Sequence, residues 1–373
     1  MIYLDNNATT KVDEKVLEEM LPYLQNDYAN PSSMYDFAKK PAAAIREARV
    51  KVRDFLGANN EKEIFFTSCG SESANMAIKG VVNCNKEKRH LITTKVEHPC
   101  VLNTYKELEK QGYEVDYIGV NAQGELNIEE LKSKLRKDTA LVSVMYANNE
   151  IGTIQPIKEL CAVAHENGSL FHTDAVQAVG HIPVDVHDLG IDMLSASAHK
   201  FNGPKGVGFL YIRSGLKVMP YSDGGAQEFG LRAGTENVAG IVGMAVALKN
   251  NCDALEDNTR SVARLESRLV SLLESTDIKY VRNGGANRLP GLLSLSFPGA
   301  DGEAVLHRLD LKGICISTGS ACNSKNTEIS HVLQSIRLDD NYAKGTVRIS
   351  LGKSNTEEDV ETILKALMKI FHT

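Results

Sequence analysis

The chain has 373 residues, of which 42% are hydrophobic and 24% are charged, and its net charge is −6. This length exceeds what one hydrophobic core usually supports, so we expect two domains in a globular protein. The negative charge argues against broad binding to nucleic acid or to an anionic membrane surface, and we predict neither as a direct partner.

The N-terminus carries no signal-like sequence, and no apolar run approaches 18 residues, so we expect neither secretion nor a membrane span. Seven cysteines occur without any Cys-x-x-Cys spacing. Free thiols of this kind are typical of a reducing compartment and not of a disulfide framework or a closed zinc site. We therefore predict a cytoplasmic protein.

Helical and strand patterns alternate over the first 213 residues. Apolar spacing predicts helices at 13–24 and 37–56. Beyond them it predicts strands at 63–68, 90–95, 115–120, 140–147, 170–175, 193–196 and 207–213, with helices at 72–84, 99–111, 128–136 and 157–166. This order is typical of βαβ units, so we predict an α/β fold with a mostly parallel seven-stranded sheet. The last two strands have no helix between them and should pair antiparallel or lie at the sheet edge.

The remaining sequence predicts a smaller α+β domain. A long helical pattern runs from 234 to 275, and we place the domain boundary inside it. Residues 14–255 would form the large domain, and 1–13 with 256–373 the small one. In the small domain we expect strands at 279–282, 292–297, 313–317 and 346–350, with helices at 303–309 and 357–371.

Open α/β sheets bind ligands beyond the carboxyl ends of their strands, so the residues that follow each predicted strand are the candidates for ligand binding. Gly70 and Ser71 open a helix directly after a strand, which favours either an anion site or an ordinary helix cap. The chain lacks Gly-x-Gly-x-x-Gly after its first strand and lacks a Gly-x4-Gly-Lys-Ser/Thr loop. Both absences weaken dinucleotide and nucleoside triphosphate interpretations.

Four further strand ends carry side chains suited to chemistry. His98 could stack on a flat ring, shuttle a proton or be a satisfied core histidine, and Asn149 could bind a ligand oxygen or cap a turn. Asp174 ends an apolar strand and requires a cationic partner if it is buried. Lys200 follows Ser197 and His199; it could link covalently to an aldehyde or be a solvated loop residue.

Together these groups match the parts of one cofactor. Pyridoxal 5'-phosphate (PLP) presents a phosphate, a ring face, a ring oxygen, a protonated ring nitrogen and an aldehyde. The anion-binding turn, imidazole, amide, carboxylate and amine at the five strand ends provide one group for each. The set favours Lys200 as the lysine that holds PLP.

The second half adds two candidate residues. Cys322 lies in a small, polar segment, Ser317-Thr-Gly-Ser-Ala-Cys322, which predicts an exposed loop carrying a nucleophilic thiol. Arg348 alternates with apolar residues on a predicted strand and could clamp a substrate carboxylate or form a surface ion pair. The histidines match no metal-ligand spacing, so we predict no metal site.

The chain closely resembles the NifS/IscS-type cysteine desulfurases of the class V aminotransferase group, which are PLP-dependent transferases of fold type I. The resemblance extends over nearly the whole chain in the order of the family. It rests on Tyr3-Leu-Asp-Asn-Asn-Ala-Thr-Thr10, Phe66-Thr-Ser, Glu97-His-Pro, Asn148-Asn-Glu-Ile-Gly152, Asp174-Ala-Val-Gln177, Ser197-Ala-His-Lys200, Gly203-Pro-Lys-Gly206, Arg232-Ala-Gly-Thr-Glu-Asn237, Ser317-Thr-Gly-Ser-Ala-Cys322 and Arg348-Ile-Ser-Leu-Gly352.

The resemblance implies a role for each matching residue. Lys200 would hold PLP and act as the base, and Cys322 would take the sulfur of L-cysteine as a persulfide, releasing L-alanine. The resemblance also implies a role for Cys322 as a transient iron–sulfur ligand. His98 would stack on the ring, and Arg348 with Asn149 would bind the substrate carboxylate. The remaining cofactor contacts would come from Gly70, Ser71, Asn149, Asp174, Gln177, Ser197, His199 and, from the partner subunit of a homodimer, Thr235.

The family also implies a sulfur acceptor, such as an iron–sulfur scaffold protein or a tRNA-thiolation enzyme. Two departures stand out: Phe229 replaces the arginine that is usual in the family, and Cys69-Gly-Ser71 stands where Gly-Ala-Thr is common. Alternatives are another enzyme of this fold, such as a selenocysteine lyase or an aminotransferase, and a non-enzymatic sulfur carrier. The thiol of Cys322 argues against an aminotransferase, and the intact Lys200 and Asp174 argue against a carrier.

Overall fold

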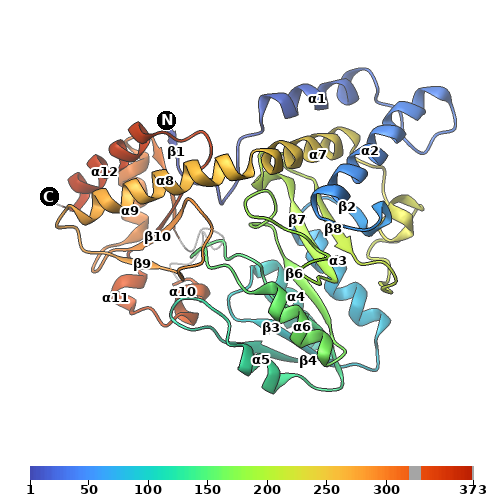
Figure 1. Ribbon diagram of the computed structural model, residues 1–373, viewed down its shortest axis with the longest axis horizontal. Helices are drawn as coiled ribbons and strands as arrows, with labels where there is room; N and C mark the ends of the chain where they lie inside the picture. The colour runs from blue at the N-terminus through green and yellow to red at the C-terminus, as the bar shows by residue number, and fades with distance from the viewer. Residues whose placement is uncertain (319–328, 372–373) are drawn as a thin grey trace.

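The computed structural model describes residues 1–318 and 329–371, and these residues form a seven-stranded sheet, a four-stranded sheet and a two-stranded sheet with their helices (Figure 1). Its helices are α1 (Glu14–Gln25), α2 (Lys39–Phe55), α3 (Gly70–Cys84), α4 (Pro99–Lys110), α5 (Ile128–Lys134), α6 (Ile157–Glu166), α7 (Val238–Asp253), α8 (Leu255–Glu274), α9 (Gly302–Asp310), α10 (His331–Ser335), α11 (Asp340–Ala343) and α12 (Glu357–Phe371). Its strands are β1 (Ile2–Tyr3), β2 (Ile64–Thr67), β3 (His90–Thr94), β4 (Glu114–Ile118), β5 (Thr139–Ser143), β6 (Leu170–Asp174), β7 (Met193–Ser197), β8 (Gly208–Ile212), β9 (Val281–Asn283), β10 (Leu292–Ser296), β11 (Ile314–Cys315), β12 (Ser317–Thr318) and β13 (Thr346–Ser350).

The large sheet has seven strands in the order β2-β8-β7-β6-β5-β3-β4. Strands β3 to β7 pair in parallel, whereas β8 runs antiparallel to both β7 and β2. This confirms the predicted α/β fold with a mostly parallel seven-stranded sheet. The antiparallel pairing of the last two predicted strands is also confirmed, but β8 lies inside the sheet and β2 forms its edge.

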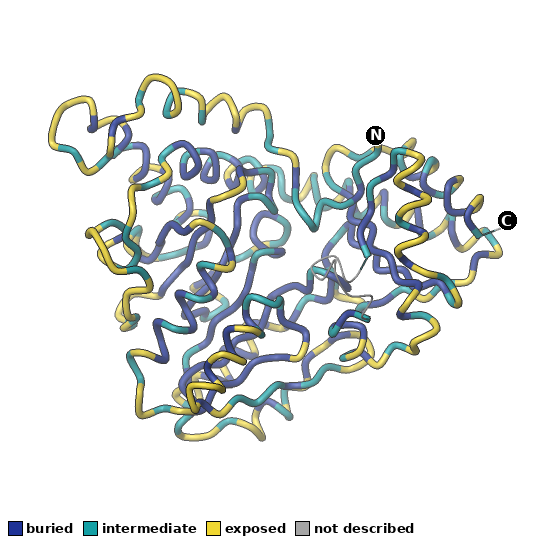
Figure 2. Tube along the Cα trace, turned by 180° about the vertical axis from the view of Figure 1, so that it is seen from behind, coloured by how far each residue is buried: buried dark blue, intermediate teal, exposed yellow. Residues whose placement is uncertain are grey.

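Helices cover both faces of this sheet, as its almost entirely buried central strands require. One apolar core lies under α1, α2, α6 and α7, with Ile45, Leu160 and Met244 among its members. A second lies under α3 and α4 and includes Met76 and Tyr105. The buried trace in Figure 2 follows the strands, and the exposed trace follows the outer surfaces of the helices and the loops.

The C-terminal part is built on a four-stranded antiparallel sheet, β12-β13-β10-β9, with a third apolar core. Leu269 of α8 and Ile363 of α12 pack against this core. The first strand, β1, pairs in parallel with β11, so the N-terminus lies within this part. The division of the chain at residue 255 stays a prediction.

Two segments differ from the sequence prediction. The helical pattern from 234 to 275 forms two helices, α7 and α8, with Ala254 between them in a non-helical conformation. The single strand predicted at 313–317 forms β11 and β12, which belong to different sheets. Among the described helices, none combines the length and the apolar character needed to cross a bilayer.

Candidate active site

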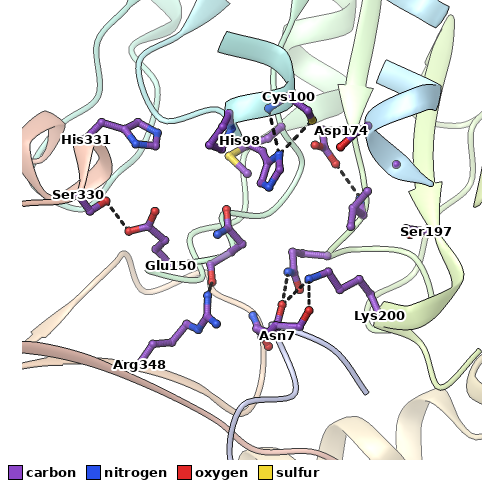
Figure 3. Close-up of a pocket in the computed structure, with 18 of the residues that line it drawn as sticks. Asn7, His98, Cys100, Glu150, Asp174, Ser197, Lys200, Ser330, His331 and Arg348 are labelled. Atoms are coloured by element: carbon purple, nitrogen blue, oxygen red, sulfur yellow. Dashed lines mark hydrogen bonds between the residues drawn. The ribbon is translucent and has the colours of Figure 1, made fainter. Parts of the chain in front are cut away.

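A cavity of about 440 Å³ opens at the carboxyl ends of the parallel strands, and residues from both sheets line it (Figure 3). Residues that immediately follow β2, β3, β5, β6 and β7 form most of its wall. Arg348 of β13 and residues of α10 close the opposite side. The location agrees with the general rule for ligand sites in open α/β sheets.

The structure brings nearly all the predicted site residues together in this cavity. Thr235 is exposed and does not line it, and Cys322 lies outside the described residues. The predicted residues that line the cavity are Gly70, Ser71, His98, Asn149, Asp174, Gln177, Ser197, His199, Lys200 and Arg348.

Lys200 ends the short helix η3 (Ala198–Lys200), which follows β7 directly. Its Nζ donates hydrogen bonds to the carbonyl oxygens of Asn7 at 2.6 Å and Ala8 at 2.8 Å. The N-terminal segment therefore orients the amine toward the cavity. Beside it, Nδ1 of His199 lies 3.2 Å from the hydroxyl of Thr9. Burial, with a further contribution from the Lys200 charge, lowers the pKa of His199 to about 4, so this imidazole is neutral near pH 7.

Helix α3 presents its N-terminus to the cavity through Gly70 and Ser71. The N-cap residue, Cys69, makes no side-chain capping bond, so N–H groups of the first turn remain available to a ligand. A Cβ atom at position 70 would lie 2.6 Å from Cγ2 of Val176, so only glycine fits between the helix and that side chain. The available N–H groups and the helix dipole favour an anion at this end of the cavity.

Asp174 ends β6 and is 6% exposed, and its Oδ1 accepts a hydrogen bond from the N–H of Val176 at 3.0 Å. Burial raises the pKa of this carboxyl, while the charges of His98 and Lys200 act in the opposite direction. A cationic ligand atom beside Asp174 would favour the ionised carboxylate. Gln177, on the segment after β6, donates from Nε2 to the carbonyl oxygen of Asn7 at 3.0 Å.

His98 caps the N-terminus of α4, where its Nδ1 accepts a hydrogen bond from the N–H of Cys100 at 3.2 Å. Burial lowers the pKa of His98. The ligand atoms of His98, Cys100 and Asp174 lie within 4.8 Å of one another, the one group among the described residues whose spacing could hold a metal ion. Burial strongly raises the pKa of the Cys100 thiol and so keeps it protonated, which opposes metal binding there.

Arg348 lies on β13 and is only 4% exposed. Its Nη1 donates to the carbonyl oxygen of Asn149 at 2.9 Å, and its Nη2 pairs with Oδ1 of Asp5 at 2.8 Å. Its Nε is buried and has no hydrogen-bond partner among the described residues. The guanidinium is thus fixed in place, and its buried Nε still lacks an acceptor among the described residues.

Several residues of the cavity were not predicted from the sequence. Asn7 and Ala8 come from the N-terminal segment, whose motif was noticed but given no role. Oε2 of Glu150 accepts a hydrogen bond from the hydroxyl of Ser330 at 2.5 Å, and burial raises the pKa of Glu150 to about 7. Glu150 directly follows Asn149 in the sequence, and this position could have identified Glu150 as a candidate site residue. Nothing in the sequence pointed to Ser330.

These residues fit the shape and charge of PLP. An anion-binding helix end, a buried carboxylate and a lysine amine all line one cavity. Gly70 leaves the space that a phosphate group beside α3 requires. Asp174 is a buried carboxylate that a protonated ring nitrogen would stabilise.

The chain matches the family model described as "Aminotransferase class-V" over residues 2–363. The chain belongs to this family. It is 48% identical to a protein named "Cysteine desulfurase IscS" from Methanosarcina thermophila, over 99% of this chain and 91% of that protein. A protein of the same name from Clostridium botulinum (strain Hall) is also 48% identical, over 99% of this chain and 94% of that protein.

Solved structures of related proteins have the same fold as this chain. One described as "NIFS-LIKE PROTEIN" has a TM-score of 0.94 and 42% identity, covering 100% of this chain and 99% of that one. Another, described as "SspA in complex with cysteine", has a TM-score of 0.85 and 38% identity, covering 95% of this chain and 100% of that one.

Proposed function

We propose that this chain is a PLP-dependent cysteine desulfurase, which removes sulfur from L-cysteine and releases L-alanine. The observation that carries the proposal is the convergence of Lys200, Asp174 and the N-terminus of α3 on one cavity that also contains Arg348. The relatives named cysteine desulfurase match almost the whole chain at 48% identity, which supports the same activity here.

The cofactor would be held by residues already placed in the cavity wall. Lys200 would supply the amine, Gly70, Ser71, Ser197 and His199 the phosphate contacts, and Asp174 the contact to the ring nitrogen. His98 would lie against the ring, and Asn149 and Gln177 on its oxygen side. When bound, PLP would withdraw electrons from the substrate Cα and so ease loss of its proton.

The chain's own residues would then bind and deprotonate the substrate. Arg348, with Asn149, would hold the carboxylate of L-cysteine. Lys200 would take the proton from Cα and return one as L-alanine forms. His98, whose pKa burial lowers, could accept a proton from a thiol in the cavity.

Cys322 would receive the sulfur. Its thiolate would attack the substrate sulfur, so that a sulfur–sulfur bond forms on Cys322 and the carbon–sulfur bond of the substrate breaks. The substrate carbon keeps the electron pair of that bond and takes up a proton, which gives L-alanine. The persulfide would pass to an acceptor, such as an iron–sulfur scaffold protein or a tRNA-thiolation enzyme in the cytoplasm.

We also propose a homodimer in which Thr235 of one subunit reaches the phosphate site of the other. Thr235 is exposed and lies away from the cavity of its own chain, which supports this arrangement. Light scattering should give twice the chain mass of 40.8 kDa. A mass equal to that of a single chain, for protein with bound cofactor, would refute the dimer.

The persulfide step can be tested by adding L-cysteine to the purified enzyme and measuring L-alanine together with protein-bound persulfide. The wild-type protein should form both, with the persulfide on Cys322. Cys322→Ala should keep the visible absorption of the cofactor and lose the persulfide. Cys84→Ala, which removes a thiol at the far end of α3, serves as the control and should behave like wild type. Wild-type persulfide formation in Cys322→Ala would overturn the assignment.

A further inference from the structure

The backbone of Asn7 is held in place by three hydrogen bonds inside the candidate site. Its N–H donates to the hydroxyl of Ser350 at 2.9 Å. Its carbonyl oxygen accepts from Nζ of Lys200 at 2.6 Å and from Nε2 of Gln177 at 3.0 Å. Asn7 therefore links β13 to the segments that follow β6 and β7, and these contacts fix its backbone beside the cavity.

The side-chain amide of Asn7 is buried but unsatisfied. Its Nδ2 has no hydrogen-bond partner in the described part of the chain, and the same holds for Nε of Arg348. Both residues line the cavity, and Figure 3 shows the side chain of Asn7 next to the guanidinium of Arg348. A buried donor without an acceptor destabilises the folded chain, so two of them on one wall point to a ligand that supplies acceptors.

The charges around these donors favour an anionic acceptor. Arg348 is positively charged, and Lys200 carries its amine on the other side of Asn7. Asp5 and the carbonyl oxygen of Asn149 already occupy one hydrogen of each terminal nitrogen of Arg348 and fix its plane. A carboxylate has two oxygens and could accept from Arg348 with one and from Asn7 with the other.

We propose that the side-chain amide of Asn7 is a further donor to the substrate carboxylate, beside Arg348 and Asn149. This inference rests on the proposed function, because it takes L-cysteine as the substrate. It makes Asn7 a specificity-determining residue: the amide would favour an amino acid over an amine of the same length that has no carboxylate.

The test uses the enzyme with its cofactor and two ligands that contain no sulfur. L-alanine carries the carboxylate, and ethylamine is the same molecule without it. Binding of each is followed through the change in visible absorption of the cofactor. In Asn7→Ala the Kd for L-alanine should rise about tenfold or more, since a hydrogen bond to a charged group contributes about 1.5–3 kcal/mol. The Kd of Asn7→Ala for ethylamine should stay within about twofold of the wild-type value.

Two further variants distinguish a donor from a structural role. Asn7→Asp places a negative charge beside the ligand carboxylate and should weaken L-alanine binding still more. Asn7→Ser keeps a short donor and should recover part of the affinity. The neighbouring Asn6→Ala is the matched control: Nδ2 of Asn6 donates to the carbonyl oxygen of Ser350 at 2.9 Å, and Asn6 does not line this cavity. Its Kd values should equal those of wild type.

An unchanged Kd for L-alanine in Asn7→Ala would overturn the inference, and so would an equal loss for both ligands. Binding of L-alanine by Asn7→Asp at wild-type strength would show that Asn7 is not a donor to the carboxylate. Failure of the proposed function looks different, because wild-type protein would then give no cofactor absorption or no response to either ligand.

Discussion

Glu97 is the most deeply buried carboxyl next to the site. Few hydrogen bonds offset the cost of burying its charge. Its Oε1 accepts hydrogen bonds from the hydroxyl of Thr94 and the N–H of Met145, both at 2.8 Å. Its Oε2 is buried and has no partner among the described residues. Burial raises the pKa of Glu97 to about 8, with Asp174 adding to the effect, so the side chain is mostly protonated at pH 7.

This raised pKa predicts a pH-dependent stability. Because the pKa of Glu97 is higher in the folded state than its ordinary value of 4.5, its stabilising effect is complete below that value and is lost as the pH rises through 8. The free energy of unfolding of Glu97→Gln, relative to wild type, should therefore rise by roughly 1 kcal/mol per pH unit across this window.

Urea unfolding of the enzyme at several pH values measures this slope. Leu131→Ala is the control, because it weakens a buried contact of α5 without changing a titrating group. Its effect on the free energy of unfolding should stay constant with pH. A flat difference for Glu97→Gln would show that Glu97 is ionised throughout.

At the scale of single residues, the sequence identified the groups that stand directly at strand ends. Asp174 and Lys200 could be predicted because a polar residue that closes an apolar strand is conspicuous. Asn7 could not be given a role, because its neighbours Lys200 and Ser350 are far away in the chain. For the same reason the sequence could not predict the hydrogen bond between Glu150 and Ser330, which lie 180 positions apart in the chain.

At the scale of elements, the segment that contains Phe229 is anchored by a buried ion pair. Glu228 binds Arg49 of α2 through both oxygens, at 2.7 and 2.9 Å, and its Oε2 also accepts from the N–H of Phe66 at 2.8 Å. Glu228 and Phe229 adopt left-handed backbone angles, with φ of 44° and 56°. Such angles are costly for these residues and persist because the ion pair fixes the segment.

Phe229, where the family resemblance leads us to expect an arginine, packs on this ion pair. Its ring lies 5.0 Å from the guanidinium carbon of Arg49 and meets Phe65 edge-on with ring centroids 5.8 Å apart. The side chain is nevertheless 54% exposed. The sequence could show the substitution but not these contacts, because Phe65 and Arg49 belong to distant elements.

Breaking the buried pair should be costly. Glu228→Gln keeps the shape of the side chain but leaves Arg49 as an uncompensated buried charge, so the free energy of unfolding should fall by about 3–5 kcal/mol. Asp253→Asn removes the partner of Lys249 in an exposed ion pair on α7. This substitution should change the free energy of unfolding by less than about 1 kcal/mol. Chemical unfolding of both variants provides the comparison, and equal losses would contradict the special role of the buried pair.

The sequence predicted the central strands of the large sheet but not every strand pairing or helix boundary. Central strands such as β5 and β6 are short apolar runs with turn residues on both sides, so they could be found. The pairing of β1 with β11, however, joins two strands of two residues each from opposite ends of the chain. The break at Ala254 was missed because helical apolar spacing continues across it.

At the scale of the whole molecule, the site depends on the meeting of two parts. The seven-stranded sheet contributes Lys200, Asp174 and the end of α3, whereas β13 contributes Arg348. The N-terminal segment connects them, because Asp5 holds Arg348 and the carbonyl oxygen of Asn7 holds Lys200. Under the proposed function, the lysine that holds the cofactor and the arginine that binds the substrate carboxylate would come from different sheets and meet in one cavity.

Under the proposed function, Lys200 in this cavity drives the release of L-alanine from L-cysteine. The most direct test is the rate of L-alanine formation by wild type, Lys200→Ala and Lys205→Ala under the same conditions. Lys205 is an exposed lysine in the turn after η3 and serves as the control. We predict that wild type and Lys205→Ala form L-alanine at similar rates and that Lys200→Ala forms none above background. L-alanine formation by Lys200→Ala at the wild-type rate, or none by wild type with bound cofactor, would contradict the account.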